Sequence, residues 1–177
     1  MKWASSFNLR IAAIFPASAI SSGGPSRPCA PSAPSRGEAK TNSDVELQAY
    51  LDDGLLHAAF DESGEPVGYV GGFTAENCLH VDEMDVHPDH QRRGIGRQMM
   101  AAILREGGAR KLVFATLTTD RFAPFNAPFY ASLGFEIIEG EDLSERLRRM
   151  LELEAEKGLD PERRVAMRAR LDRLSKV

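Results

Sequence analysis

The chain has 177 residues, which is enough for one domain with a sizeable core and some excess chain. Hydrophobic residues make up 42% and charged residues 27%, as is ordinary for a soluble globular protein, and no apolar run is long enough to span a bilayer. The net charge of −4 argues against nucleic acid as the main partner, because a phosphate-binding face must be basic.

The N-terminal segment differs in composition from the rest of the chain. The first forty residues hold five of the ten prolines and eight serines, and the first 37 contain no acidic residue. Apolar periodicity is missing from Ser21 to Thr41, so we expect residues 1–42 to be an atypical, disordered segment and residues 43–177 to form the domain. The first twenty residues suit a targeting segment or an unusual chain start, and we favour the latter because Pro16 interrupts a weak apolar stretch.

The first predicted elements are a helix and three antiparallel strands. Ser43 and Glu46 have the capping-box spacing, so a short helix is expected to begin at Ser43 and run through Leu51. Runs of apolar residues separated by turn residues then predict strands at residues 55–61, 67–73 and 78–86.

The later elements alternate between helices and strands. A helix with Ile95, Met99, Ala102 and Ile103 on one face is expected to end at the glycine pair Gly107–Gly108. Glycine, proline and serine signals then predict a strand at 111–119, a helix at 128–133, a strand at 135–138 and a helix at 144–157. Residues 165–171 alternate with a period of two, which favours a closing strand, although their alanines and arginines also suit a helix. The predicted fold class is α+β, with a mixed sheet flanked by helices.

The most informative stretch runs from Val86 to Arg97, where an apolar strand passes through a basic loop into a helix. Gly94 and Gly96 lie where the N–H groups of a helix start would be bare, so a pyrophosphate could approach the backbone closely. The helix dipole and nearby arginines would add attraction. A dinucleotide-binding loop would need a third glycine, and a P-loop would need a Gly-Lys-Ser/Thr ending, and the stretch has neither.

Two motifs together resemble the GNAT N-acetyltransferase superfamily. The first, Gln91-Arg92-Arg93-Gly94-Ile95-Gly96, is similar to its acyl-CoA pyrophosphate motif. The second runs from Asn126 through Tyr130 to Leu133-Gly134-Phe135, and one predicted strand separates the two motifs, as in the family. The resemblance covers residues 43–139. It implies an acyl-CoA N-acyltransferase-like fold with a centrally splayed sheet, and acetyl-CoA as the co-substrate.

The resemblance also assigns residues to the cofactor. The strand before the loop would pair its backbone with the pantetheine arm, and the N–H of Val86 would polarise the thioester carbonyl. Asn126 resembles a CoA-contacting residue of the family, and a helix N-cap ahead of Pro128 is an alternative or additional role. The cofactor-binding residues implied in this way are Met84, Asp85, Val86, Gln91, Arg92, Arg93, Gly94, Ile95, Gly96, Arg97, Asn126 and Tyr130.

Tyr130 is the catalytic acid that the resemblance implies. A phenol with a pKa of about 10 could protonate the departing CoA thiolate. The structural alternative is a tyrosine that packs on the sheet between Phe129 and Phe135.

A general base is expected on the strand before the glycine loop. An alkylamine with a pKa of about 10.4 must lose a proton before it attacks the thioester. His80 and Asp82 lie on the same strand face as Val86 by the period of two, so they are the first candidates, acting directly or through water. Glu83, on the opposite face, is the third candidate. For each of them the alternative is a polar, partly exposed strand position.

The remaining polar residues do not indicate a metal site. The spacing of His80, His87, His90 and Cys78 matches no metal-binding motif. The two cysteines form no disulfide framework, which favours a reducing compartment and a cytoplasmic location. The charged helix expected at 144–157 is interpreted as a solvated or packing element rather than as a nucleic-acid surface.

The sequence therefore predicts an acetyl-CoA-dependent N-acetyltransferase that acts on a primary amine by direct transfer in a ternary complex. The expected acceptor is a small-molecule or peptide amine, with no metal, nucleic acid or membrane involved, and a homodimer is left open. The main alternative is an acyl-CoA-binding or regulatory module with weak catalysis, or a truncated remnant, because residues 1–42 do not supply the family's first strand and helix. A nucleotide-binding module that uses the same loop is a third hypothesis.

Overall fold

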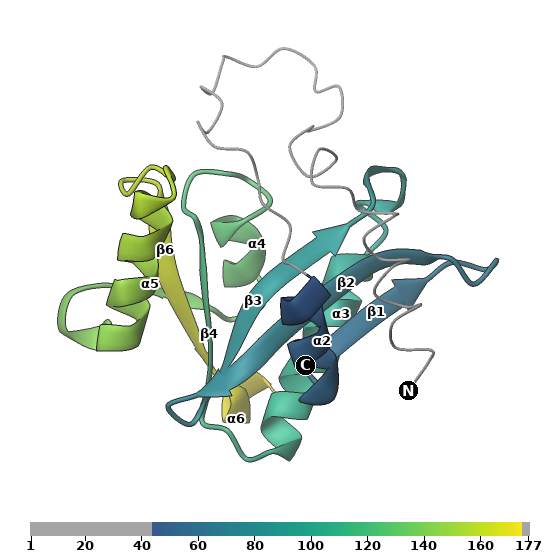
Figure 1. The fold of residues 1–177 in the computed structure, drawn as a ribbon, viewed down its shortest axis with the longest axis horizontal. Helices are drawn as coiled ribbons and strands as arrows, with labels where there is room; N and C mark the ends of the chain where they lie inside the picture. The colour runs from purple at the N-terminus through teal and green to yellow at the C-terminus, as the bar shows by residue number, and fades with distance from the viewer. Residues whose placement is uncertain (1–43, 175–177) are drawn as a thin grey trace, which may run out of the picture. The chain divides into compact units, whose positions relative to one another are not determined.

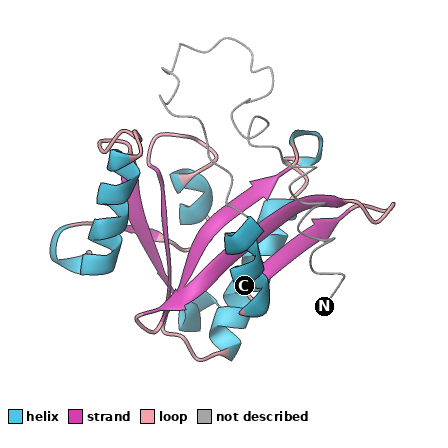
Figure 2. Ribbon diagram, viewed as in Figure 1, coloured by secondary structure: helices cyan, strands magenta, loops and turns pink. Residues whose placement is uncertain are grey.

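The computed structural model describes residues 44–174 as a mixed sheet with helices (Figures 1 and 2). Six strands within this range follow the order β1-β2-β3-β4-β6-β5 in the sheet. The described residues divide into two compact units, of which the first holds residues 44–73 and 81–106 and the second holds residues 74–80 and 107–174. The predictions made for residues 1–42 and for a helix cap at Ser43 lie outside the described residues.

The first unit contains a helix, a hairpin and the start of a long helix. Its elements are α2 (Asp44–Asp52), β1 (Leu56–Phe60), most of β2 (Pro66–Ala75) and of β3 (Cys78–Val86), and most of α3 (Ile95–Ala109). β1 and β2 pair in antiparallel fashion. The Asp61 carboxylate closes their turn by accepting hydrogen bonds from the N–H groups of Ser63 and Glu65. The predicted helix and strands of this part are confirmed to within a few residues at their ends.

The end of α3 differs from the prediction. The helix continues through Gly107 and Gly108 to Ala109, and the left-handed residue after it is Lys111, with φ +60°. Gly107 is needed for packing rather than for a helix cap, because an added Cβ would lie 3.1 Å from the Leu79 side chain and 3.2 Å from that of Leu171. The strand expected at 111–119 therefore begins only at residue 114.

The second unit is built around β6. Its further elements are β4 (Phe114–Asp120), α4 (Ala127–Ala131), β5 (Glu136–Ile138), the 3-10 helix η2 (Gly140–Asp142), α5 (Glu145–Glu156), β6 (Arg164–Arg170) and α6 (Leu171–Leu174). β6 pairs in antiparallel fashion with β4 on one side and with β5 on the other. The strand prediction for residues 165–171 is confirmed apart from Leu171, which begins α6. Pairing on both edges outweighs the helix preference of its alanines and arginines.

The pairing of β3 with β4 is short. The two strands run parallel, and their register covers three residue pairs, from Cys78–Phe114 to His80–Thr116. β3 continues to Val86 and β4 to Asp120 without further pairing to each other, whereas β6 pairs with the other edge of β4 over its whole length. The parallel pairing and its early end agree with the mixed, splayed sheet that was predicted.

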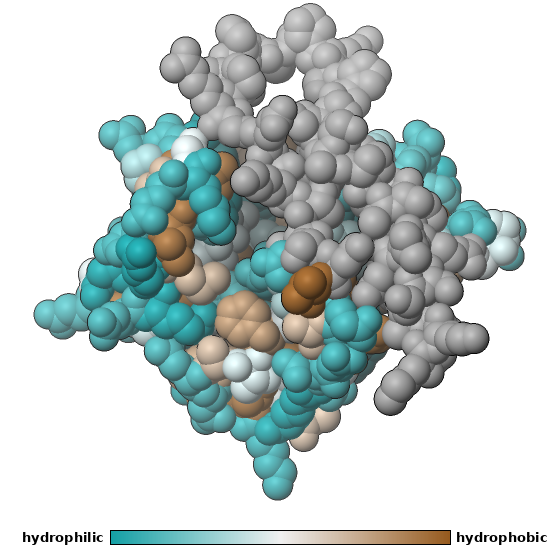
Figure 3. All heavy atoms as spheres, in the orientation of Figure 1, coloured by the Kyte–Doolittle hydropathy of each residue, from teal (hydrophilic) through white to brown (hydrophobic). Residues whose placement is uncertain are grey.

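The charged helix α5 packs through one face. Ser144 caps it by accepting a hydrogen bond from the N–H of Leu147, and Leu147 is buried with Ile138 and Ala166. Figure 1 shows α5 lying alongside β6. On the face drawn in Figure 3, hydrophilic residues predominate and the apolar residues form small separate patches. Among the described residues, no helix combines the length and the apolar character needed to cross a membrane.

The core of the first unit joins α2 to β2. Leu47 and Tyr50 of α2 are buried against Tyr69 of β2, and Figure 1 shows α2 lying across that strand. The approach is close because Gly71 has no side chain. A Cβ at this position would lie 2.3 Å from Cδ2 of the Tyr50 ring.

The Gly71→Ala substitution is expected to destabilise the protein by about 1–3 kcal/mol, since either the Tyr50 ring or the strand must move. Gly108→Ala is the matched control, because its added Cβ meets no atom within 4 Å and alanine favours a helix over glycine by about 0.5–1 kcal/mol. Urea unfolding measures both changes. Equal effects of the two substitutions would contradict the close packing at Gly71.

Candidate active site

The loop after β3 is held by backbone and side-chain hydrogen bonds. His87 begins the short 3-10 helix η1 (Pro88–His90), and its Nδ1 atom accepts a hydrogen bond from the N–H of Asp89 at 3.3 Å. The N–H of His87 donates to the Val67 carbonyl of β2 at 2.9 Å. Gln91 then reaches back, and its Nε2 donates to the Val86 carbonyl at 3.0 Å. The start of the loop is thereby tied to the end of the strand.

The helix start after this loop leaves its backbone open to a ligand. Arg92 and Gly94 have left-handed backbones, with φ of +60° and +81°. No described atom lies within 4 Å of the position that a Cβ of Gly94 would occupy. The Gly94 carbonyl accepts the N–H of Gln98, so the N–H groups of Ile95 and Gly96 precede the first intrahelical hydrogen bond.

The electrostatics of this helix start favour an anion. The first turn of α3, which the structure describes completely, contains no acidic residue. Three exposed arginines lie close to it in the sequence: Arg92 and Arg93 just before the helix and Arg97 in its first turn. Bare N–H groups, a helix dipole and positive charge together form the type of site that binds phosphate groups. The residues present thus fit the pyrophosphate expected from the sequence.

The last residues of β3 are half-buried, and one of their backbone groups already has a partner. The N–H of Val86 donates to Oδ1 of Asp85 at 2.8 Å. Burial raises the pKa of Asp85 above its usual value, and the hydrogen bond from Val86 opposes this shift. If the N–H of Val86 is to polarise a thioester carbonyl, the Asp85 carboxylate must first turn away from it.

The two candidate carboxylate bases lie next to each other on β3 and differ in exposure. Asp82 is exposed, and its Oδ2 atom accepts a hydrogen bond from the hydroxyl of Tyr50. Glu83 is half-buried, and its negative charge adds to the effect of burial in raising the pKa of Tyr69. Tyr50 precedes Asp82 by 32 residues, so no local pattern in the sequence links the two.

His80, predicted together with Asp82 as a first candidate for the base, lies at the opposite extreme of burial. Its side chain is 0% exposed, and Nδ1 lies 3.0 Å from Oγ1 of Thr116. Burial lowers the pKa of His80 to about 3, and the positive charge of Arg146 lowers it further. The imidazole is therefore neutral at physiological pH.

Tyr130 lies in α4 among aromatic neighbours. Its ring is 5.2 Å from that of Phe129 and 6.0 Å from that of Phe135, in edge-to-face arrangements. Burial raises the pKa of Tyr130 to about 12, and Arg164 opposes this shift. The packing that was considered as an alternative for Tyr130 is present, and it is compatible with a catalytic hydroxyl.

Asn126 occupies the N-cap position of α4. Its carbonyl accepts the N–H of Tyr130 at 3.0 Å, whereas its side chain makes no capping hydrogen bond with the described residues. The N-cap alternative from the sequence is therefore correct in position but not in side-chain contact. Asn126 and Tyr130 belong to the second unit, as does His80, and the other predicted site residues belong to the first.

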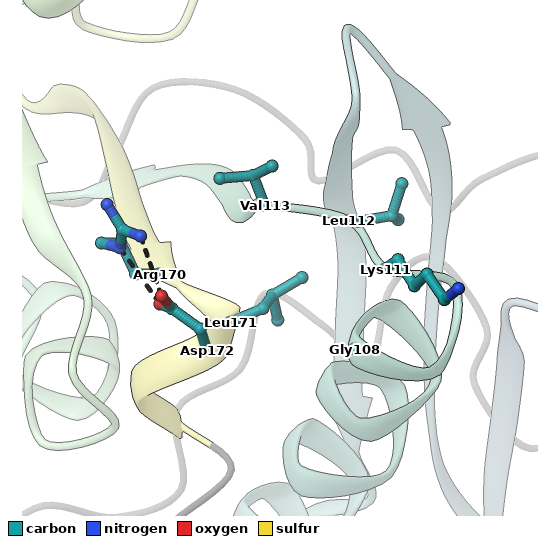
Figure 4. A pocket seen from close by; sticks show the side chains of 7 residues that line it. All are labelled: Gly108, Lys111, Leu112, Val113, Arg170, Leu171 and Asp172. Carbon is teal, nitrogen blue, oxygen red and sulfur yellow. Dashed lines mark hydrogen bonds and ion pairs between the residues drawn. The ribbon is translucent and has the colours of Figure 1, made fainter.

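A separate cavity of about 350 Å³ opens in the second unit (Figure 4). It lies beside the end of α3, residues 111–113 and the junction of β6 with α6, where Arg170 and Asp172 form an ion pair. None of its lining residues is a predicted site residue. Across the described part of the chain, no three His, Cys, Asp or Glu side chains gather in a way that could hold a metal ion.

Comparison with known proteins identifies the domain. Residues 52–137 match a family model described as an acetyltransferase (GNAT) domain. Nourseothricin acetyltransferase has a similar structure, with 20% identity and a TM-score of 0.51 over 66% of this chain and 64% of that one. The chain thus spans less than two thirds of that protein.

Two further structures are similar at low identity. The ribosomal-protein-S18-alanine N-acetyltransferase from Escherichia coli is 17% identical, with a TM-score of 0.56 over 77% of this chain and 81% of that one. N-acetylglutamate synthase from Neisseria gonorrhoeae, in a complex with coenzyme A and N-acetyl-glutamate, is 16% identical, with a TM-score of 0.58 over 74% of this chain and 28% of that one. At these identities the likeness confirms the predicted acyl-CoA N-acyltransferase-like fold.

The buried His80 predicts a pH dependence of stability. Its pKa falls from 6.5 to about 3 on folding, so the stability it contributes is complete above pH 6.5 and is lost as the pH falls from 6.5 towards 3. This loss amounts to as much as roughly 5 kcal/mol. In His80→Asn, whose amide is neutral at every pH, urea unfolding between pH 4 and 8 is expected to show a smaller decrease on acidification. The half-buried His90, changed to Asn, is the control, and equal pH slopes for His80→Asn and the wild type would contradict this prediction.

Proposed function

The chain carries a GNAT acetyltransferase domain and belongs to that superfamily, and from this premise we propose that it transfers the acetyl group of acetyl-CoA to a primary amine by direct attack in a ternary complex. The observation that carries the proposal is the helix start at Gly94, which has open space at the Cβ position, no acidic residue in the first turn and a preceding loop tied to β3 through Gln91. A helix start of this kind, directly after a strand, suits the binding of a pyrophosphate.

Acetyl-CoA would be held along one continuous segment of the first unit. Its pyrophosphate would accept hydrogen bonds from the N–H groups at the start of α3, with charge from Arg92, Arg93 and Arg97. Its pantetheine arm would lie along the backbone from Met84 to Val86. The hydrogen bond from Gln91 to the Val86 carbonyl supports this assignment, because it fixes the strand end relative to the loop.

We assign Tyr130 the role of donor to the departing thiolate. With a pKa of about 12 its hydroxyl keeps its proton at every working pH. The same shift makes complete proton transfer to a thiolate unfavourable, by about 1.4 kcal/mol for each pKa unit that separates the two groups. The first contribution of Tyr130 is therefore a hydrogen bond to the developing negative charge, and protonation follows as the thiolate leaves.

Asp82 is the base that the surroundings favour. A base must reach both the amine and, after the reaction, the solvent, and Asp82 is exposed whereas His80 is fully buried. The pKa of His80, lowered to about 3, also makes that imidazole a poor proton acceptor at neutral pH. Glu83, half-buried one residue further along, is the second candidate.

A second function is favoured by one observation. The Asp85 carboxylate occupies the N–H of Val86, which the family resemblance assigns to the thioester carbonyl. If this hydrogen bond persists when acetyl-CoA binds, the chain is an acyl-CoA-binding module with weak catalysis. Binding without turnover would identify this case.

Acetyl-CoA is expected to raise the thermal unfolding temperature, whereas ATP and NAD at the same concentration should have much smaller effects. Arg93→Glu, which reverses a charge beside the glycines, should weaken acetyl-CoA binding by about 10-fold. Arg105→Glu, an exposed position further along α3, is the matched control and should bind as the wild type does. Stabilisation by ATP equal to that by acetyl-CoA would favour the nucleotide-binding hypothesis instead.

Tyr130→Phe tests catalysis. With a panel of primary amines, release of free CoA by this variant should fall by about 100-fold in kcat, because a positioned proton donor contributes on that order. The dissociation constant for acetyl-CoA should change by less than about twofold, since the aromatic packing is kept. Tyr69→Phe removes a hydroxyl from a more deeply buried tyrosine and serves as the control. An unchanged kcat in Tyr130→Phe would remove this residue from the mechanism.

A further inference from the structure

We propose that Tyr50 of α2 is a positioning residue for Asp82, which it holds in the orientation required of the acceptor-side base. This inference rests on the proposed acetyltransferase function and adds a residue to it. Tyr50 lies outside both sequence motifs, and it acts through Asp82 rather than on a substrate.

The contact itself is a hydrogen bond between side chains from two different elements. The hydroxyl of Tyr50 donates to Oδ2 of Asp82. An ionised carboxylate has about four acceptor sites, so this single bond fixes the group while leaving acceptor capacity for an incoming N–H or a water. Charge-assisted hydrogen bonds of this kind are shorter and stronger than neutral ones.

Tyr50 can position its partner because its own ring is held firmly. The side chain is only 4% exposed and packs with Leu47 and Tyr69. The Cδ2 and Cε2 side of the ring lies against Gly71, where even a methyl group would overlap it. The Tyr50 carbonyl also accepts the N–H of Leu55 at 2.7 Å, which fixes the end of α2 against the start of β1. The hydroxyl is therefore carried by a side chain with little freedom to move.

The neighbouring carboxylate provides a comparison within the same strand. Glu83 has a tyrosine nearby as well, because its charge raises the pKa of the fully buried Tyr69. Glu83 is itself half-buried, whereas Asp82 is exposed. The Tyr50–Asp82 pair therefore combines a fixed carboxylate with access from solvent, which an amine acceptor needs.

The expected effect of the hydroxyl follows from the position that it gives to the carboxylate. Loss of position is costly, since a displacement of about 1 Å in a catalytic group can slow a reaction on the order of 100-fold. Removal of the hydroxyl is therefore expected to slow the reaction.

The experiment is a double-mutant cycle on the full chain with Tyr50→Phe, Asp82→Asn and the two combined. Tyr50→Phe keeps the ring against Gly71 and should lower kcat by roughly 10-fold while the KM for acetyl-CoA changes by less than about twofold. Asp82→Asn should lower kcat more. In the Asp82→Asn background, Tyr50→Phe should change kcat by less than about twofold, because the base that Tyr50 positions is gone.

Tyr69→Phe is the matched control, since it removes a hydroxyl from the same buried cluster without touching Asp82. It should leave kcat within about twofold of the wild type. If Tyr50→Phe does not fold, as judged by its thermal unfolding, Gly71→Ala replaces it in the cycle, because it displaces the Tyr50 ring without removing the hydroxyl.

The possible outcomes separate the two proposals. Equal losses of kcat in Tyr50→Phe and Tyr69→Phe, or an undiminished effect of Tyr50→Phe in the Asp82→Asn background, would overturn the positioning role while the acetyltransferase function stands. A larger loss of kcat in Tyr69→Phe than in Tyr50→Phe would also overturn it, and would indicate Glu83, near Tyr69, as the positioned base. A wild-type protein that releases no CoA with any amine would overturn the proposed function, and the positioning role would fall with it.

Discussion

One strand, β3, contributes residues to both units of this protein, and its pairing with β4 ends after three residue pairs. Up to His80 the strand is paired with β4, and Leu79 and His80 are fully buried. Beyond His80 the strand continues through the carboxylates Asp82 and Glu83 to a half-buried end at Val86, and the glycine loop follows it. The same strand thus supplies a structural histidine at one end and, towards the other, the carboxylate base candidates and the backbone proposed for the pantetheine arm.

The burial gradient along β3 explains why neighbouring polar residues have different chemistry. His80 is fully buried and uncharged at neutral pH, whereas Asp82, two residues later on the same predicted face, is exposed. A period of two predicts that such residues share one face, but it does not show how deep each lies. Depth is set by the elements packed on the strand, and it separates a residue that contributes to stability from one that can accept a proton.

The parts that could be predicted from sequence are those whose physics is local. β3 was predicted to its exact ends, and the helix expected at 144–157 and the strand at β6 were also correct in kind. Errors arose where packing overrides a local signal. The glycine pair Gly107–Gly108 predicts a helix end, but Leu79 and Leu171 require a small residue at Gly107, and the helix continues past it. The Asp85 hydrogen bond that occupies the N–H of Val86 was also missed, because a backbone role inferred from resemblance says nothing about a neighbouring side chain.

Cofactor binding and acceptor activation, the two halves of the proposed reaction, also differ in how far they depend on local sequence. A pyrophosphate site can be encoded within about ten consecutive residues, because it needs only backbone N–H groups, room for close approach and positive charge. Positioning a carboxylate for an amine requires instead a contact such as that of Tyr50 with Asp82, between residues 32 positions apart and dependent on a glycine in a third element. A single substitution at Gly71, Tyr50 or Asp82 would change the acceptor side and leave the loop from Val86 to Arg97 intact. The identity of the acceptor is therefore expected to depend on tertiary packing around α2, where a sequence motif carries little information.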